Sequence, residues 1–259
     1  MNNIFPKTIS HVGIISPAGP ADRARIEAGV ALLHGWGLKV TVMPHVFSGT
    51  LESYLSASAA ERLSDLHDCW NDESIDLVIC ARGGFGSAHL LPEIDWKLLR
   101  SRPLPLIGYS DITALHMGML KMHAGIPVVA PMAAKLHEAF IENQFAEYTA
   151  GYCRSAMLGL PEQIKSPDGS NPVRIIKPGS VEALPLPANL AVMVTLCGTE
   201  YFPDVTDRVL ILEDLKKEKL SLSRNPKMRT TKTIASIPQQ NIIFSMTVSS
   251  IFFDFIDIP

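Results

Sequence analysis

The feature that most constrains the fold is the alternation of short apolar runs with helix-like segments over the first 160 residues. Apolar runs of strand length occupy His11–Ser16, Lys39–Met43, Ile75–Cys80, Leu104–Tyr109 and Pro127–Ala130. Several are continuous rather than alternating, which is typical of strands covered on both faces. Strand–helix–strand repetition with right-handed crossovers therefore predicts an α/β fold, in which helices cover both faces of an N-terminal parallel sheet.

The segments between these runs predict the helices and also indicate where chemistry belongs. The expected helices are Asp22–Trp36, Ala57–Trp70, Asp111–Ala124 and Glu138–Leu158. A further helix is expected after Gly83–Gly86, with Pro92 as an interruption. Ligands of parallel sheets bind at the carboxyl ends of the strands. The loops of interest are therefore Ser16–Gly19, Arg82–Ser87 and Ser110–Asp111.

The composition changes twice in the second half of the chain, and these changes predict the domain organisation. Residues 161–180 are rich in Pro, Gly, Ser and Asn, as expected of a linker. The linker would join an α/β domain at 1–160 to a smaller second domain at 181–259. In that second domain, Arg208–Leu212 is an expected strand that leads into Glu213. An atypical tail begins at about residue 215, where basic residues first predominate.

Composition excludes several broad classes of protein. The chain of 259 residues is 47% hydrophobic and 19% charged, which argues against a disordered or fibrous chain. Its net charge of −3 gives no basic footprint for nucleic acid or an anionic membrane. The four cysteines are scattered, and neither a secretory signal nor a run of ~20 apolar residues is present. We therefore expect a cytoplasmic protein without zinc, disulfides, nucleic-acid partners or membrane attachment.

The stretch Gly108-Tyr109-Ser110-Asp111 lies where the fourth expected strand meets the next helix. A serine at such a corner can project from a sharp turn beside backbone N–H groups that stabilise an oxyanion. The match to the nucleophile elbow G-x-S-x-G is partial, because Ile112 replaces the second glycine. An ordinary helix N-cap is the commoner use of Ser and Asp at this position, and it remains the alternative.

The glycine-rich stretch Arg82-Gly83-Gly84-Phe85-Gly86 follows the third expected strand. Glycines allow a close backbone approach to a ligand and positive φ angles. A nucleotide-binding module is weakly supported, because no Gly-Lys-Ser/Thr follows and His89 occupies the third glycine position of G-x-G-x-x-G. A tight turn with a solvated or paired Arg82 is an equally good interpretation.

A serine nucleophile needs a base, so the positions of the histidines matter. His116 would lie about 9 Å along the helix axis from Ser110, which is a poor position for a base. His89 follows the glycine loop and is the one local candidate. No histidine occurs after His137. Glu213 ends an apolar strand and could orient a base, although a polar strand end in a turn is the commoner situation.

Taken together, the segments Ala81–Trp96 and Leu106–His116 resemble the LD-carboxypeptidase family of serine peptidases. This family includes muramoyl-tetrapeptide carboxypeptidases and microcin-immunity peptidases. Val12–Pro20 fits the family's first strand and loop, and Ala188–Asp204 and Val209–Asp214 are similar to its later segments. The resemblance covers residues 10–214.

The resemblance implies a Ser–Glu–His triad at the junction of an N-terminal α/β domain and a C-terminal β-rich domain. Carried over by position, Ser110 is the nucleophile and Glu213 orients the base. Backbone N–H groups of Asp111 and of the glycine loop near Gly84 would bind the oxyanion, and Arg82 would help to hold the substrate. The resemblance implies a small murein peptide as substrate, no metal and no organic cofactor. Homodimers are common in the family.

Two departures from the family pattern bear on activity. Pro187 and Ala188 precede Asn189 where the family usually has glycines, and the family's catalytic histidine beyond the glutamate is missing. The abrupt change after Asp214 suggests that the C-terminal segment was replaced, by a frameshift or by divergence. The favoured function is a serine carboxypeptidase that cleaves an L,D-amide bond and releases the terminal D-alanine of a murein tetrapeptide. The alternatives are a microcin-immunity-type peptidase and a catalytically inactive homologue that lacks the triad histidine.

Overall fold

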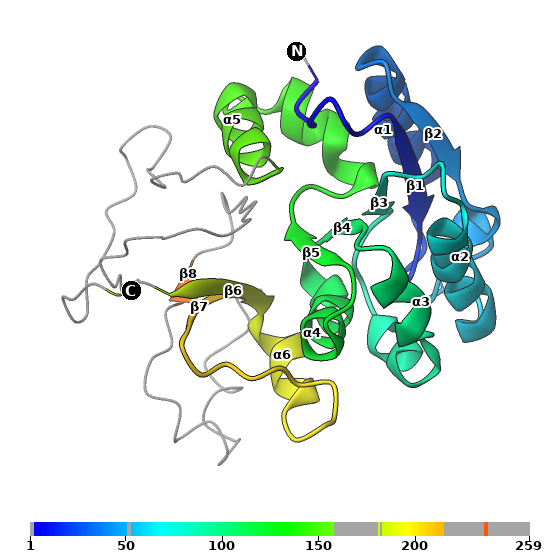
Figure 1. Cartoon of the computed structure of the whole chain (residues 1–259). Coiled ribbons are helices and arrows are strands. Elements are labelled where there is room, and N and C mark those ends of the chain that lie inside the picture. Colours follow the sequence, from blue (N-terminus) through cyan, green and yellow to red (C-terminus); the bar gives the residue numbers. More distant parts are fainter. Residues whose placement is uncertain (1–2, 51–52, 158–180, 182, 215–235, 238–259) are drawn as a thin grey trace.

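The first half of the chain forms a five-stranded parallel sheet. The computed structural model describes residues 3–50, 53–157, 181, 183–214 and 236–237 (Figure 1). The strands of the first sheet are β1 (His11–Ile15), β2 (Lys39–Val42), β3 (Leu77–Cys80), β4 (Pro105–Gly108) and β5 (Ile126–Val129). Their order is β2-β1-β3-β4-β5, and every neighbouring pair is parallel. The predicted α/β fold and all five of its strands are confirmed, within two residues at each end.

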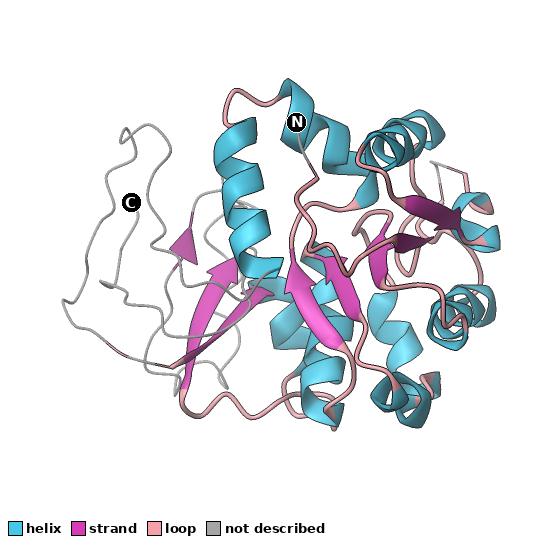
Figure 2. Cartoon of the chain, turned by 45° about the horizontal axis from the view of Figure 1, so that its top comes forward, coloured by secondary structure: helices cyan, strands magenta, loops and turns pink. Residues whose placement is uncertain are grey.

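Helices cover both faces of this sheet (Figure 2). The helices of the first half are α1 (Arg23–Gly35), α2 (Ala59–Asn71), α3 (Trp96–Ser101), α4 (Thr113–Met122) and α5 (Ala146–Met157). Short 3-10 turns also occur: η1 (Pro44–Phe47), η2 (Ser87–Glu93), η3 (Ser110–Ile112) and η4 (Ala133–Lys135). Helix α2 packs against α3 and η2, whereas α1 packs against η4, which follows β5. This arrangement is the two-sided cover that the alternating pattern predicts.

Two of the expected helices are broken in the structure. The segment expected as Glu138–Leu158 consists of η5 (Glu138–Glu142), which is a π-helical turn, and α5, with Asn143 between them. The Asn143 side chain accepts a hydrogen bond from the Phe145 N–H, a local turn that competes with continuation of the helix. The segment that contains Pro92 forms the 3-10 turn η2 instead of an α-helix, because proline removes a backbone donor.

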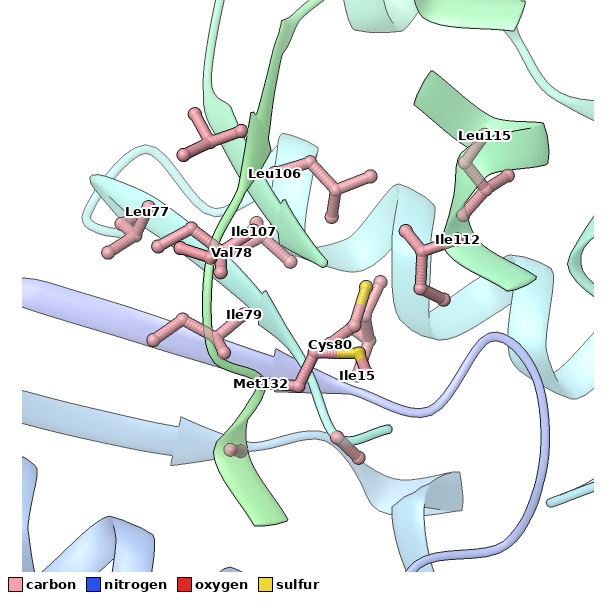
Figure 3. Close-up of a cluster of buried hydrophobic side chains, with 14 of the residues drawn as sticks. Ile15, Leu77, Val78, Ile79, Cys80, Leu106, Ile107, Ile112, Leu115 and Met132 are labelled. Atoms are coloured by element: carbon pink, nitrogen blue, oxygen red, sulfur yellow. The ribbon is translucent and has the colours of Figure 1, made fainter. Parts of the chain in front are cut away.

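The core lies between the sheet and the helices that follow β3 and β4. The buried Leu106 side chain of β4 points toward Ile112 and Leu115, which follow the Ser110 turn, whereas Ile79 of β3 lies on the other face of the sheet (Figure 3). Burying an aliphatic side chain of this size contributes about 1.5–3 kcal/mol. Ile112 and Leu115 are each at most 1% exposed, so this packing anchors the first turns after Ser110 to the sheet.

A second, three-stranded sheet has the order β6 (Leu184–Asn189), β7 (Arg208–Glu213), β8 (Ser236–Ile237), and helix α6 (Leu190–Leu196) follows β6. All of its strand pairs are parallel. Strand β6 packs against η3, and α6 packs against α4 (Figure 1). The expected linker at 161–180 lies outside the described residues, as does the tail from residue 215 apart from β8. The division into two domains therefore remains a prediction.

Candidate active site

Three loops meet at the carboxyl end of the first sheet. The sheet reverses its order between β1 and β3, and such a switch point opens a crevice beside the strand ends. The loop after β1 and the loop after β3 are joined there, because the Gly19 N–H donates to the Gly83 carbonyl at 3.2 Å. The third loop carries Ser110. The structure thus brings together the three loops that the sequence indicated.

Ser110 has a backbone conformation that is rare for a residue with a side chain. Its φ angle is +62°, in the left-handed region that favours glycine. Gly108 makes the corner compact, because a methyl group at that position would lie 2.6 Å from the Ile112 side chain. Ile112, which departs from the G-x-S-x-G pattern, therefore packs directly on the first glycine of the motif.

The N-cap alternative for Ser110 and Asp111 is wrong. Tyr109 and Ile112 occupy the cap positions of η3 and α4, and neither cap has a side-chain hydrogen bond. Among the described residues, no hydrogen bond reaches the Ser110 hydroxyl group. Ser110 therefore has a strained backbone and a side chain that does not stabilise the helix start, as expected of a functional residue.

Gly83 lies against the Ser110 turn and brings no side chain next to the hydroxyl group. A methyl group at Gly83 would lie 3.1 Å from Ser110 Cβ, 3.3 Å from its Oγ and 3.4 Å from the backbone nitrogen of Asp111. Any larger side chain would cover the hydroxyl group and the adjacent N–H. A glycine at this position therefore leaves room for a reacting carbonyl group between the serine and a backbone donor.

The Asp111 side chain is buried and holds the start of η2. Its Oδ2 accepts a hydrogen bond from the Ser87 N–H at 2.9 Å, and its backbone carbonyl accepts one from Ser87 Oγ at 2.6 Å. These two contacts fix the residue that follows Ser110 to the loop that follows β3. The backbone N–H of Asp111 therefore belongs to a rigid turn, which suits an oxyanion donor.

Gly84 and Arg82 lie further from Ser110 than Gly83 does. Gly84 has a φ angle of +126°, and a methyl group there would meet the backbone of Gly19 at 3.1 Å. The exposed Arg82 donates from Nη1 to the Pro20 carbonyl at 3.3 Å. Both residues thus join the loops after β1 and β3, and the Arg82 side chain is exposed to solvent.

Glu213 ends β7 and is held by an asparagine from the neighbouring strand. Its Oε2 accepts a hydrogen bond from Asn189 Nδ2 at 2.9 Å. The Asn189 N–H donates to Thr113 Oγ1 at 3.0 Å, and Thr113 begins the helix that follows Ser110. This chain of two hydrogen bonds connects the end of the second sheet to the first residue of α4, directly after the Ser110 turn.

The electrostatics of Tyr109 show which charged groups surround this turn. Burial raises the pKa of the Tyr109 phenol, the carboxylates of Glu138 and Glu213 raise it further, and Arg82 lowers it. Tyr109 is adjacent to Ser110, so the charges of Glu213 and Arg82 act at the Ser110 turn although these two residues follow strands of different sheets. The turn therefore lies among charged groups of both signs.

No imidazole is hydrogen-bonded to Ser110 among the described residues, which include all eight histidines of the chain. His116 is buried, its Nε2 donates to the Leu106 carbonyl at 3.1 Å, and burial lowers its pKa to about 4. His116 is therefore a neutral residue of the core. His89 is exposed, and its ring packs edge-on against Phe85 of the glycine loop, with centroids 5.0 Å apart.

In the part of the chain that the structure describes, no group of three or more His, Cys, Asp or Glu side chains is placed to hold a metal ion. None of the helices in the same residues combines the length and the apolar character needed to cross a membrane.

Sequence reasoning missed three residues of this site. Gly83 was not separated from its glycine neighbours, because only the packing shows which glycine faces Ser110. Thr113 and Ser87 look like ordinary polar residues of a helix start and a loop. Asn189 gave a signal, since it stands between a Pro-rich strand and an apolar helix, where a capping asparagine is favoured.

Comparison with known proteins identifies the family. The model of the LD-carboxypeptidase N-terminal domain matches residues 12–130. A Streptomyces coelicolor protein named as a carboxypeptidase is 33% identical over 220 residues, which are 83% of this chain and 68% of that protein. A Bacillus subtilis protein named as a murein peptide carboxypeptidase is 29% identical and covers 86% of this chain and 68% of its own length.

Relatives of a second kind match as well. The microcin C7 self-immunity protein of Escherichia coli is 24% identical over 242 residues, which are 82% of this chain and 69% of that protein. A crystal structure of a related protein from Bacillus anthracis has a TM-score of 0.70 at 24% identity and covers 83% of this chain and 70% of its own. That structure supports the fold alone. Together with the site geometry, the identity and coverage of the Streptomyces coelicolor relative show that this chain belongs to the LD-carboxypeptidase family of peptidases.

Proposed function

We propose that the chain is a serine-type carboxypeptidase that cleaves the L,D-amide bond of a murein tetrapeptide and releases the terminal D-alanine. The observation that carries the proposal is the Ser110 turn, where a strained, half-buried serine lies directly against Gly83, which has no side chain to cover the hydroxyl group and the Asp111 backbone. Such a turn presents a hydroxyl group to a carbonyl carbon while a backbone donor meets the oxygen. The murein peptide is suggested by the name of the Bacillus subtilis relative.

In this proposal each residue has a defined role. Ser110 Oγ attacks the carbonyl carbon and gives its proton to the base, and the backbone N–H of Asp111, with one from the glycine loop near Gly84, binds the oxyanion. The base returns this proton to the departing nitrogen as the C–N bond breaks, D-alanine leaves, and water hydrolyses the acyl-enzyme. Glu213 orients the base, with Asn189 holding the carboxylate, and Arg82 contacts the substrate at the rim.

The identity of the base separates this proposal from a second candidate function. The chain has no histidine after His137, and among the described residues none is bonded to Ser110. These facts favour a catalytically inactive homologue that binds peptide without cleaving it. If the protein is active, His89 is the imidazole to test, since it follows the glycine loop and is exposed. His89→Gln would then abolish turnover.

Release of D-alanine from a murein tetrapeptide by the purified full chain tests the proposal. We expect release by the wild-type chain and none by Ser110→Ala, with both chains folded by circular dichroism. Retained activity in Ser110→Ala would refute the nucleophile assignment. Bound but uncleaved peptide in the wild type would favour the inactive homologue.

The same assay decides the substrate class. The microcin self-immunity relative matches most of the chain, so an aminoacyl-nucleotide amide should be offered in parallel with the tetrapeptide. The higher kcat/KM identifies the preferred substrate. A cytoplasmic location, a homodimer and the division into domains at 1–160 and 181–259 also remain proposals, testable by fractionation, sedimentation and limited proteolysis.

A further inference from the structure

A buried arginine lies behind the two loops that flank Ser110. Arg62 on α2 is 1% exposed, which is unusual for a guanidinium group. Its Nη1 donates to the carbonyls of Pro17, in the loop after β1, and of Gly86 in the glycine loop, the latter at 2.9 Å. Its Nε donates to the Ala57 carbonyl at 3.1 Å. One side chain thus binds three segments of backbone at the carboxyl end of the sheet.

The contact with Gly86 matters most, because it is one half of a shared peptide unit. The carbonyl of the Gly86–Ser87 peptide accepts from Arg62, and the N–H of the same peptide donates to the Asp111 carboxylate at 2.9 Å. A buried cation and a buried anion therefore hold opposite ends of one peptide dipole. Hydrogen bonds to charged groups are about twice as strong as neutral ones, so this peptide is held firmly.

The geometry around Gly86 shows that the fit is tight. Gly86 has a φ angle of +107°, and a methyl group there would lie 2.4 Å from Leu55 and 3.3 Å from Arg62 Nη1. The pKa of Arg62 reflects these surroundings, because burial lowers it while the charge of Asp111 raises it. Among the described residues, Arg62 Nη2 has no hydrogen-bond partner. Balance of the buried charge therefore depends on Asp111 and the bound carbonyls.

We propose that Arg62 is a positioning residue that acts through the Gly86–Ser87 peptide to fix Asp111, and with it the backbone N–H next to Ser110. The inference rests on the proposed role of that N–H as an oxyanion donor. An oxyanion donor contributes only if its orientation is set before the reaction. Without the guanidinium, the Gly86 carbonyl and the Asp111 carboxylate would both lose their buried counterpart, and the turn would relax.

A double-mutant cycle on unfolding in urea tests the coupling without any need for activity. It compares Arg62→Met, Asp111→Asn and the double variant. The matched control is Arg102→Met, because Arg102 also binds backbone carbonyls, those of Cys69, Asp72 and Ile75, before β3 at the amino end of the strands. For Arg62→Met and Asp111→Asn, we expect the double variant to change the unfolding equilibrium constant by a factor that differs about tenfold from the product of the two single effects. For the control pair, Arg102→Met and Asp111→Asn, we expect this difference to be less than about twofold. If the effects of Arg62→Met and Asp111→Asn on the unfolding constant simply multiply, the inference is wrong.

Kinetics on the full chain provide the second readout. Per folded molecule, we expect Arg62→Met to lower kcat for tetrapeptide hydrolysis by about 10²-fold with KM unchanged. The kcat of Arg62→Lys should lie between those of Arg62→Met and the wild type. The kcat of Arg102→Met should equal that of the wild type. An unchanged kcat in Arg62→Met would contradict the positioning role. If the wild type itself is inactive, the proposed function fails and the unfolding cycle decides the inference. If Arg62→Met does not fold, Arg62→Lys replaces it in both measurements.

Discussion

Ser110 combines a positive φ angle with a hydroxyl group that is not used to stabilise the fold. Left-handed backbone costs a residue with a side chain roughly 1–2 kcal/mol. The φ angle of +62° is kept because the core anchors the residues after it, with Ile112 fully buried and packed on Gly108. The molecule therefore holds Ser110 in place at the expense of stability, as is common for nucleophiles on sharp turns.

The strain at Ser110 can be measured by substitution. Ser110→Gly should be more stable to unfolding than Ser110→Ala by about 1 kcal/mol, because glycine adopts the left-handed conformation without penalty. Both variants lack the hydroxyl group, so neither should hydrolyse peptide. Chemical denaturation of the pair gives the difference. Equal stabilities would show that the turn relaxes to an ordinary conformation in the protein.

The substitution Gly83→Ala tests whether the substrate needs the position next to the Ser110 hydroxyl group. Gly83→Ala would place a methyl group 3.3 Å from Ser110 Oγ, in the position proposed for the reacting carbonyl group. Because the φ angle of Gly83 is not positive, alanine fits the backbone, and the fold should be retained. We expect kcat/KM to fall by at least about 10²-fold with circular dichroism unchanged. Normal turnover in Gly83→Ala would show that the substrate approaches Ser110 from another side.

In helix α4, the role of His116 becomes clear only from its packing in the structure. Its predicted distance along the helix from Ser110 makes His116 a poor base. Its actual environment, buried and donating to the Leu106 carbonyl of the neighbouring strand β4, could not be deduced from periodicity. The same helix shows why its start was mispredicted at Asp111, since the 3-10 turn η3 precedes it.

His116 also predicts how stability depends on pH. Its pKa is lowered from 6.5 to about 4, so between these values the unfolded state binds more protons and stability is lost as the pH falls. The full shift corresponds to about 3 kcal/mol. His116→Gln keeps a donor for Leu106 but does not titrate. Between about pH 7.5 and pH 4.5, the free energy of unfolding should therefore fall less in this variant than in the wild type. Parallel pH profiles for the two chains would contradict the assignment.

Across the whole molecule, the sequence indicated the first sheet well because continuous apolar strands and intervening helices leave few alternatives. It also placed the loops of the site, since they follow β1, β3 and β4. It could not predict contacts that depend on the meeting of distant segments. Arg62 with Gly86, and Asn189 with Thr113, are 24 and 76 residues apart, and no local pattern reports such pairs.

The account of the whole molecule depends on Ser110 being a reactive nucleophile in this chain. The most direct measurement is labelling of the folded full chain with a fluorophosphonate serine probe, followed by intact mass and peptide mapping. We predict a single adduct on Ser110 that is absent in Ser110→Ala and slower to form in Gly83→Ala. A folded wild-type chain with no adduct, or with the adduct on another serine, would contradict the central claim.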